Sequence, residues 1–350
     1  MHDRQPALHA SAAAGDAGDT IETVEALEAL IGARPDMVDL KVIDHLDAQA
    51  RRWIAASPLA FAGFGAAGQT DVTLAGGAPG FASVLSGQRL RMPRALLDDP
   101  RHARPGCGVG LLFLIPGLGE TLRVNGTVET APGSQVLIAV QECYAHCAKA
   151  LLRSDFWQPT TAAAPADMAS FLAACRFMAL ATADAGLRTD VSPKGDPAGL
   201  LARADGDAIC FADRPGNRRT DSFRNLLARP HAAAALVVPG CTQVVIVRGD
   251  ARLTADARLR QAFAVQDKTP KLVTRLLPSS VTMYESIALA RATPWASPPP
   301  PPDIDPAEVF AAHVRLNKTR GLRAALAKGA VSIPGLMRKG LKQDYKRNMY

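Results

Sequence analysis

From residue 58 onward, short apolar runs alternate with glycine- and proline-rich turns, and this pattern predicts β-strands. The runs PLAFAGF, TDVTLAGGAPGFASVL, QRLRMP, GVGLLFLIPG and ETLRVNGTVET form a set of about six strands. Since no helical periodicity interrupts the set, it indicates an antiparallel barrel. Within it, the pair Asn125–Gly126 is either a turn or an irregularity of a strand. Before the set, the pattern predicts a short helix capped by Thr20 and a second helix over residues 42–56.

The same order of elements then restarts, which indicates an internal repeat. A helix is predicted over residues 142–154, and a linker separates it from a second helix and a second set of strands. TDVTLAGGAPGF (70–81) aligns with TDVSPKGDPAGL (189–200), LIPG with VVPG, and ALLRSDFW (150–157) with ALARATPW (288–295). Three matches in one order make chance an unsatisfactory explanation.

This repeat divides the chain into five predicted parts. Residues 1–41 form an N-terminal extension that we expect to be partly disordered, 42–158 the first repeat, 159–169 a linker and 170–295 the second repeat. Residues 296–350 form a proline-rich spacer, a helix over about 306–327 and a basic tail. The tail could contact a membrane surface, a nucleic acid or a partner protein, and a solvated, partly helical extension is the interpretation we favour.

Composition narrows the function classes. A chain of 350 residues with 48% hydrophobic and 21% charged residues is long enough for two globular domains. Its formal net charge is +7, but residues 303–350 contain ten Lys or Arg and four Asp or Glu, so the rest is nearly neutral. This balance argues against a nucleic-acid-binding core.

The cysteine spacing and the hydropathy pattern indicate whether the protein binds a metal and where in the cell it resides. None of the six cysteines forms a CxxC pair, so neither a metal site nor a disulfide framework is predicted. Neither a secretory signal nor an apolar window of membrane-spanning length is recognisable. We therefore expect a cytoplasmic protein with reduced cysteines.

The candidate chemistry lies in residues 188–225. Two adjacent guanidinium groups, Arg218 and Arg219, precede a predicted helix start and lie near Ser222, a combination suited to a phosphate monoester. Lys194 is on an earlier turn, from which it could reach the electron-rich edge of a flat ligand. A solvated hairpin with scattered surface charge is the alternative, but it does not explain two Gly/Pro turns and a charge cluster between apolar strands.

The two repeats differ at these positions. Lys194 and Asp196 of the second repeat correspond to Ala75 and Gly77, and the arginine pair has no counterpart in the first repeat. Conversely, the first repeat contains HCAKALLRS where the second has ESIALARA. One composite site, with its front from the second repeat and its back from the first, would therefore be intact. The opposite site would be degenerate.

Taken together, TDVSPKGDP, DRPGNRRTDSFRN, the VPG strand and HCAKALLRSDFW resemble the FMN-binding split-barrel family related to pyridoxamine 5′-phosphate oxidase. The resemblance covers residues 42–295 in two copies. It implies an α+β, mainly β fold with two tandem six-stranded antiparallel split β-barrels. Since members of this family are usually homodimers with FMN at the subunit interface, it also implies an intrachain pseudo-dimer that can be monomeric.

The resemblance also assigns roles to individual residues. Arg218 and Arg219 would hold the FMN phosphate, Lys194 would place its charge near N1/O2 of the flavin ring, and that cation would favour the anionic reduced flavin. The implied cofactor-binding residues of the second repeat are Arg188, Asp190, Val191, Ser192, Pro193, Lys194, Asn217, Arg218, Arg219, Ser222 and Asn225. Those of the first repeat are His146, Lys149, Arg153, Ser154 and Trp157.

The implied function is that of an FMN-dependent oxidoreductase acting on a small molecule. Electrons would come from a reduced donor and pass to oxygen or a small organic acceptor. The resemblance specifies neither the substrate nor a catalytic residue. The alternative is a non-catalytic flavin- or haem-binding module, or a scaffold that docks a partner through its basic tail. A yellow colour that a reductant bleaches would favour the enzyme, and a Soret band would favour haem.

Overall fold

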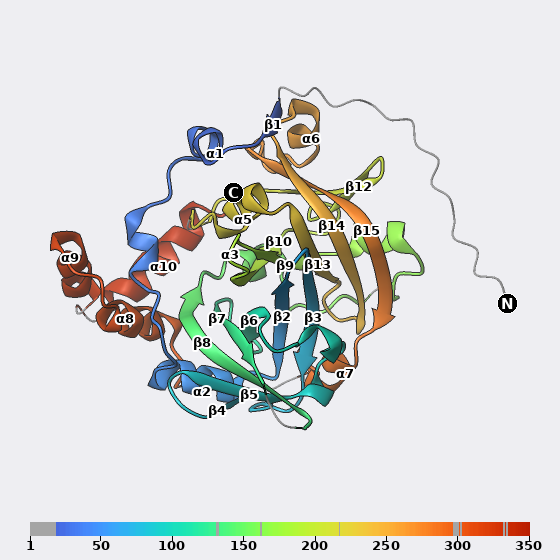
Figure 1. The fold of residues 1–350 in the computed structure, drawn as a ribbon. Helices are drawn as coiled ribbons and strands as arrows, with labels where there is room; N and C mark the ends of the chain where they lie inside the picture. Colours follow the sequence, from blue (N-terminus) through green and yellow to red (C-terminus); the bar gives the residue numbers. More distant parts are fainter. Residues whose placement is uncertain are drawn as a thin grey trace.

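The computed structural model describes residues 19–130, 133–161, 163–216, 218–296, 301, 303–331, 333 and 335–350. Two antiparallel sheets form its centre (Figure 1). The first contains β2 (Leu59–Ala66), β3 (Gln69–Gly76), β4 (Ser83–Val84), β5 (Arg89–Pro93), β6 (Gly108–Leu114), β7 (Thr121–Glu129) and β8 (Gln135–His146). Its strand order is β3-β2-β6-β7-β8-β5-β4. We call β2–β8 the first half.

The second sheet repeats this order. It contains β9 (Phe177–Ala183), β10 (Thr189–Gly195), β11 (Arg203–Asp205), β12 (Ala208–Ala212), β13 (His231–Val237), β14 (Gln243–Thr254) and β15 (Val273–Glu285). Its order is β10-β9-β13-β14-β15-β12-β11, so each strand has a counterpart in the first sheet. We call β9–β15 the second half. The mainly β, antiparallel prediction is confirmed. Each half has seven described strands instead of about six, because the very short β4 and β11 lack a recognisable alternating pattern.

A matched irregularity interrupts both sheets. The pairing of β7 with β8 shifts between Asn125 and Gly126, and that of β14 with β15 shifts between Arg248 and Gly249. A Cβ at Gly126 would lie 2.1 Å from the Ala139 carbonyl oxygen, so a side chain does not fit there. The Asn–Gly pair is therefore an irregularity within a strand and not a turn.

The halves pack against each other with reciprocal contacts. β3 contacts β13 and β6 contacts β10, while α3 (Lys149–Arg153) lies on β10 and α7 (Ile287–Ala292) lies on β3. At both helix contacts a glycine permits the approach. A Cβ at Gly195 would lie 1.9 Å from the Ala150 oxygen, and one at Gly76 would lie 2.3 Å from the Ala288 oxygen. Phe61, Phe156 and Phe177 stack between the halves.

Three helix predictions need correction. Residues 142–146 continue β8, pairing with β7 up to Thr121↔His146, and only residues 149–153 form the helix α3. The N-terminal helix α1 (Val24–Ile31) is capped by Thr23, whereas Thr20 belongs to the short strand β1 (Thr20–Ile21). α2 (Ala48–Ala56) begins later than predicted, after its N-cap Asp47. The remaining short elements are η2 (Asp36–Asp39), η3 (Arg94–Leu96), η4 (Pro100–His102), α4 (Met168–Ala174), α5 (Asp221–Ala228) and α6 (Ala257–Ala262).

The elements β1 and α1, which precede the first half, pack on the second half, and a helix near the other end of the chain packs on the first half. β1 pairs with β14, and Leu27 of α1 is buried in the core of the second half. At the other end, α8 (Pro306–Leu316), α9 (Leu322–Val331) and α10 (Leu336–Arg347) follow one another, and Val309 and Phe310 join the core of the first half. The predicted disorder of the N-terminal extension concerns residues 1–18, which lie outside the described residues, as does most of the proline-rich spacer.

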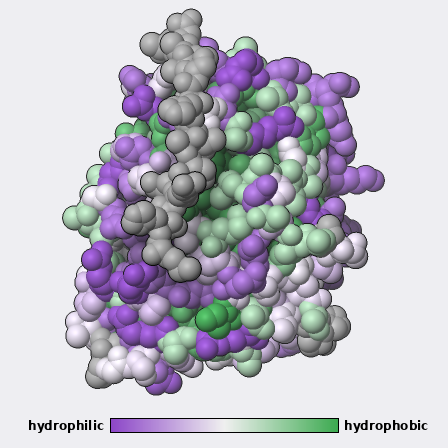
Figure 2. Space-filling view, turned by 90° about the vertical axis from the view of Figure 1, so that its right-hand side faces the viewer, coloured by the Kyte–Doolittle hydropathy of each residue, from purple (hydrophilic) through white to green (hydrophobic). Residues whose placement is uncertain are grey.

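One face of the molecule shows how hydrophobic and hydrophilic residues are distributed over the surface. On the face shown in Figure 2, hydrophobic residues lie among hydrophilic ones, as is normal for folded proteins. Among the described helices, none has the length and apolar character needed to cross a membrane.

Candidate functional site

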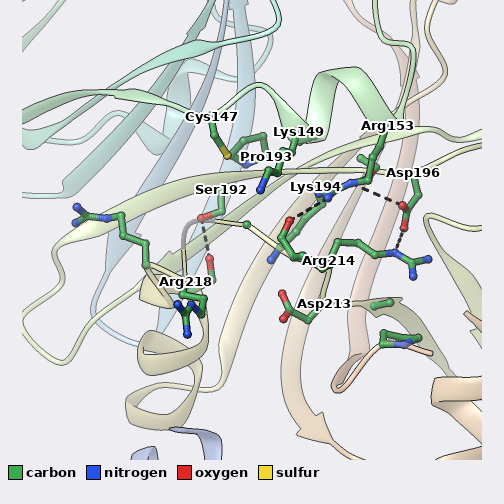
Figure 3. Close-up of a pocket in the computed structure, with 18 of the residues that line it drawn as sticks. Cys147, Lys149, Arg153, Ser192, Pro193, Lys194, Asp196, Asp213, Arg214 and Arg218 are labelled. Atoms are coloured by element: carbon green, nitrogen blue, oxygen red, sulfur yellow. Dashed lines mark hydrogen bonds and ion pairs between the residues drawn. The ribbon is translucent and has the colours of Figure 1, made fainter. Parts of the chain in front are cut away.

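A cavity of about 760 Å³ lies between the two halves (Figure 3). The first half contributes the end of β8 and the helix α3, and the second half contributes β10 and the segment 212–223. This volume lies within the range of about 300–1,000 Å³ typical of sites for cofactors and small ligands. We call it the main cavity.

Nine predicted site residues line the main cavity, although they come from distant parts of the sequence. They are His146, Lys149, Arg153, Ser192, Pro193, Lys194, Arg218, Arg219 and Ser222. The contact of α3 with β10 brings the first-half residues to the second-half residues. The fold thus assembles a composite group that contains members of both predicted motifs.

Four other predicted site residues are not in the cavity wall or are not described. Val191 is buried in the core between the halves, because alternate residues of a strand point to opposite faces. Ser154 is also buried, and its hydroxyl donates to the Leu151 oxygen at 3.0 Å. The indole N–H of Trp157 donates to the Leu118 oxygen. Asn217 lies outside the described residues.

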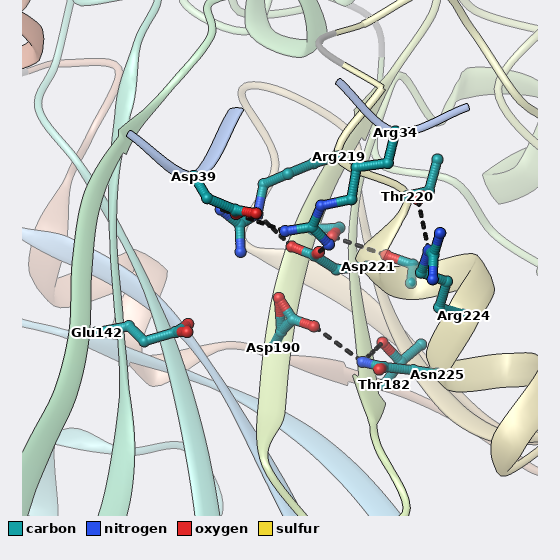
Figure 4. Close-up of polar contacts among 12 residues, drawn as sticks. Arg34, Asp39, Glu142, Thr182, Asp190, Arg219, Thr220, Asp221, Arg224 and Asn225 are labelled. Atoms are coloured by element: carbon teal, nitrogen blue, oxygen red, sulfur yellow. Dashed lines mark hydrogen bonds and ion pairs between the residues drawn. The ribbon is translucent and has the colours of Figure 1, made fainter. Parts of the chain in front are cut away.

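Arg188, Asp190 and Asn225 line a second cavity of about 520 Å³, which shares Arg219 and Asp221 with the main cavity (Figure 4). The Asp190 carboxylate accepts from Arg123 Nη1 at 2.5 Å and from Asn225 Nδ2 at 2.8 Å. A polar network therefore separates the two cavities.

The adjacent arginines have different environments. Arg219 is 8% exposed, ion-pairs with Asp221 and with Asp39 at 3.1 Å, and stacks on the Tyr144 ring with 4.4 Å to its centroid. Arg218 is exposed at the wall of the main cavity. Both Arg218 (φ 54°) and Thr220 (φ 58°) have left-handed backbone conformations, so the chain turns sharply between the two side chains.

Ser192 and Ser222 are joined at the floor of the main cavity. The Ser222 hydroxyl donates to Ser192 Oγ at 2.8 Å, and Arg123 Nη2 donates to the same oxygen at 3.0 Å. Arg123 is 1% exposed and comes from β7 of the first half. The sequence analysis missed it, although a charged residue inside the apolar run TLRV was an available signal.

The charges in the cavity wall are predominantly positive. Nine Lys or Arg and four Asp line the main cavity, an excess of five positive charges. Lys194 lies over the Phe223 ring, 4.9 Å from its centroid, and no hydrogen bond or ion pair to another described residue is found for its ammonium group. Burial lowers the pKa of Lys194, and burial raises the pKa of the neighbouring Asp213 carboxyl.

His146 is a neutral group in this setting. Burial lowers the pKa of the His146 imidazole well below its usual value, and the positive charges of Arg123 and Lys41 lower it further. Its Nδ1 lies 3.9 Å from the Cys147 sulfur. His146 can thus donate or accept a hydrogen bond near neutral pH without adding charge.

The C-terminal segment (residues 336–350) forms part of the cavity wall, which sequence reasoning did not anticipate. Lys149 Nζ pairs with Asp344 at 2.8 Å, Arg153 Nη1 donates to the Met349 oxygen at 3.0 Å, and Lys268 Nζ donates to the Tyr350 oxygen at 2.8 Å. The segment therefore contacts both halves.

At the corresponding position of the other half, Gly77, Leu96 and Arg291 line a smaller cavity of about 460 Å³, and Asp98 binds the start of α7. Asp98 accepts hydrogen bonds from Ala288 N at 2.7 Å and from the Ser286 hydroxyl at 2.5 Å, at the first turn of α7. Arg291 Nη1, the counterpart of Arg153, donates to the Ala95 oxygen at 2.6 Å. A carboxylate of the chain thus occupies the helix start that is the counterpart of α3.

Comparisons with known proteins give the following matches. Residues 164–286 match the family model described as pyridoxamine 5′-phosphate oxidase. HupZ from Group A Streptococcus is 14% identical over 36% of this chain and 98% of its own, with a TM-score of 0.30. An F420 reductase is 17% identical over 34% and 98%, with a TM-score of 0.27. A pyridoxamine 5′-phosphate oxidase-related, FMN-binding protein from Nostoc punctiforme is 16% identical over 31% and 75%, with a TM-score of 0.23.

None of the curated proteins compared matches the sequence. The family model begins near α4 and ends at the start of α7, so it spans β9–β15 and only those segments of the main cavity wall that belong to the second half. Over residues 164–286, about a third of its length, the chain is therefore similar to the pyridoxamine 5′-phosphate oxidase family.

Proposed function

We propose that the chain binds one FMN in the main cavity and is a flavoprotein oxidoreductase acting on a small molecule. The observation that carries this proposal is the composite cavity itself, in which motif residues of both halves meet around an excess of positive charge. A phosphate monoester carries about −1.5 to −2 charges near neutral pH, so this wall suits it. The family match over residues 164–286 supports the choice of a flavin.

The residues present fit FMN in kind. Arg218, Ser222 and the N-terminal backbone N–H groups of α5 would hold the phosphate, since helix starts and guanidinium groups favour anions. Lys194 and Pro193 would lie near the flavin ring, where Lys194, whose pKa burial lowers, would supply a cation. When bound, FMN would supply electron transfer between a reduced donor and an acceptor.

The chain's own residues would set the conditions for that transfer. α3 and the C-terminal segment cover the cavity and reduce access of water. Neutral His146 can hold or pass a proton at its ring nitrogens, and the Ser192–Ser222 pair can orient a polar ligand group. We assign no catalytic residue, and either oxygen or a small organic molecule would serve as acceptor.

We further propose that the halves form an intrachain pseudo-dimer, with repeats over residues 42–158 and 170–295, and that its second site is degenerate and does not bind FMN. The equal strand orders and the reciprocal helix contacts support the first point. Asp98 at the start of α7, together with Ala75 in place of Lys194, supports the second. A ligand phosphate there would have to displace a carboxylate of the chain.

An absorption spectrum and an FMN titration test this function. We expect flavin absorbance that a reductant bleaches, and quenching of FMN fluorescence that saturates at about one FMN per chain. Two equivalent sites per chain would contradict the degenerate second site. A Soret band in place of flavin absorbance would show that the haem-binding alternative is correct.

A further inference from the structure

The helix α10 has two faces of different character. On its inner face, Met337 and Leu341 pack on the core of the first half, and Asp344 pairs with Lys149 at 2.8 Å. These contacts fix the rotation of the helix about its axis, because residues three, four and seven positions apart share one side of a helix. The opposite side, which we call the outer face, is therefore held toward solvent.

The outer face of α10 is basic. It presents five exposed cations at spacings of three and four residues, namely Arg338, Lys339, Lys342, Lys346 and Arg347. Arg338 and Lys342 border a cavity that also contains carboxylates, which offset part of their charge. No ion pair to another described residue is found for Lys339, Lys346 or Arg347. At least three positive charges of this face are thus available to an anionic partner.

Exposed aliphatic side chains are concentrated beside this face. Of the eight exposed large hydrophobic residues in the described part of the chain, four lie at the end of α8, in α9 or at the start of α10: Leu316, Leu326, Ile333 and Leu336. Ala327 and Val331 of α9 pack with residues of α8, whereas Leu326 is 65% exposed and Ile333 is 57% exposed. α9 lies at the edge of the molecule, away from both sheets (Figure 1). Such a concentration of exposed apolar residues indicates a contact surface.

Cations next to exposed aliphatic side chains suit the surface of an anionic membrane. The lipid headgroups attract the ammonium and guanidinium groups, and the boundary of the acyl chains accepts the aliphatic side chains. The backbone of a nucleic acid offers phosphates to the same cations but no apolar phase. The exposed Leu326, Ile333 and Leu336 therefore favour lipid over nucleic acid.

We propose that α9 and α10 dock on an anionic lipid surface through the outer face of α10 and the exposed aliphatic side chains of residues 326–336. The inner face keeps its contacts, so docking requires no unfolding of the helices. Asp344 of the inner face lines the main cavity. Docking would therefore hold this cavity about one helix diameter, roughly 10 Å, from the headgroups. The proposal does not depend on which cofactor the cavity binds.

Cosedimentation of the full chain with vesicles tests the proposal. One set of vesicles contains phosphatidylcholine and phosphatidylglycerol, and the other contains phosphatidylcholine alone. We expect the anionic vesicles to bind the chain at least about tenfold more tightly than the neutral ones, because each cation near an anionic surface adds to the attraction. Raising the salt concentration should weaken binding, since it screens these charges.

Charge variants locate the surface. The triple variant Lys339→Gln/Lys346→Gln/Arg347→Gln should weaken binding to the anionic vesicles about a hundredfold, since each cation near such a surface contributes about fivefold. A matched control removes three exposed arginines from other parts of the chain and should change binding less than about twofold, because charges far from the surface are screened. This control is Arg91→Gln/Arg104→Gln/Arg252→Gln.

An apolar variant tests the second part of the surface. Leu326→Ser/Leu336→Ser leaves the charge unchanged and should weaken binding about tenfold, because it removes two aliphatic side chains that would enter the headgroup boundary. Circular dichroism checks that each variant is folded. The comparison of the two vesicle types uses the wild type, so it needs no variant.

The outcomes also separate this inference from the proposed function. Equal binding to both vesicle types, no binding to either, or binding that the triple variant leaves unchanged would overturn it. Tighter binding to a duplex oligonucleotide than to anionic vesicles, lost in the triple variant, would overturn it in favour of a nucleic acid. FMN binding should be unchanged in the triple variant, since none of its three residues lines the main cavity. A chain that binds anionic vesicles but no FMN would refute the flavin proposal and leave the lipid surface standing.

Discussion

At the scale of residues, Arg218 and Arg219 are adjacent in sequence and differ in what their guanidinium groups contact. Arg219 is held by Asp221 and Asp39 and lies over the Tyr144 ring. Arg218 is exposed in the wall of the main cavity. A ligand phosphate would therefore gain more from Arg218, whereas the fold depends more on Arg219.

Alanine substitutions should separate these roles. Arg218→Ala should weaken FMN about tenfold and riboflavin much less, since riboflavin has no phosphate. Arg219→Ala should lower the free energy of unfolding by about 1–2 kcal/mol, because it removes the ion pairs with Asp221 and Asp39 and the contact with the Tyr144 ring while Arg34 still pairs with both carboxylates, and it should weaken both ligands alike. Fluorescence titration and chemical denaturation measure the two effects. If Arg219→Ala weakened FMN much more than riboflavin and Arg218→Ala did not, the phosphate would bind at Arg219.

Sequence reasoning identified site residues next to turns and missed those that depend on tertiary contacts. Lys194, Ser192 and Ser222 belong to recognisable motifs, and all three line the main cavity. Arg123 reaches it from β7 of the other half, and no local pattern describes a contact with Ser192 69 residues away. Arg214 lies in the motif DRPGNRRTDSFRN, but its hydrogen bonds to Asp196 and Phe263 depend on tertiary contacts that no local pattern describes.

At the scale of elements, the type of most strands was predictable and the extent of β8 was not. Residues 142–146 fit both a helical and an alternating pattern. Residues 142–146 form a strand because they pair with β7. Only five residues then remain for the helix α3. The same limit applies to α10, whose basic sequence indicates a solvated helix, although Asp344 and Tyr345 bind residues of the first half.

The contact of α10 with the cavity wall has a measurable consequence. Asp344→Asn should loosen the C-terminal segment and raise the FMN dissociation rate about two- to fivefold, because it removes the partner of the buried Lys149. Stopped-flow fluorescence measures the rate, and limited proteolysis within α10 reports the loosening. Lys346→Gln, an exposed change on the same helix, should alter neither. Equal rates in both variants and in the wild type would mean that α10 does not limit ligand exchange.

At the scale of the whole molecule, the repeat was visible in the sequence because three aligned motifs preserve their order. That the second site is degenerate stays a prediction from missing residues, and the contacts of Asp98 with the start of α7 support it by a feature that the alignment could not contain. The positions of the two chain ends could not be predicted, since β1 joins a sheet whose pairing strand lies far along the sequence.

The crossing of the N-terminal segment to the second half determines when that segment can fold during synthesis. Leu30 accepts a hydrogen bond from Lys271, 241 residues later, and β1 must wait for β14. At about 5–20 residues per second, the ribosome needs roughly 12–50 s to supply those partners. We expect residues 20–31 to be cleaved by protease in ribosome-bound chains arrested before β14 emerges and to be protected once β15 has left the exit tunnel. Protection of residues 20–31 in the shorter chains would contradict this expectation. It would show that the segment first packs on the first half, which is synthesised before β14.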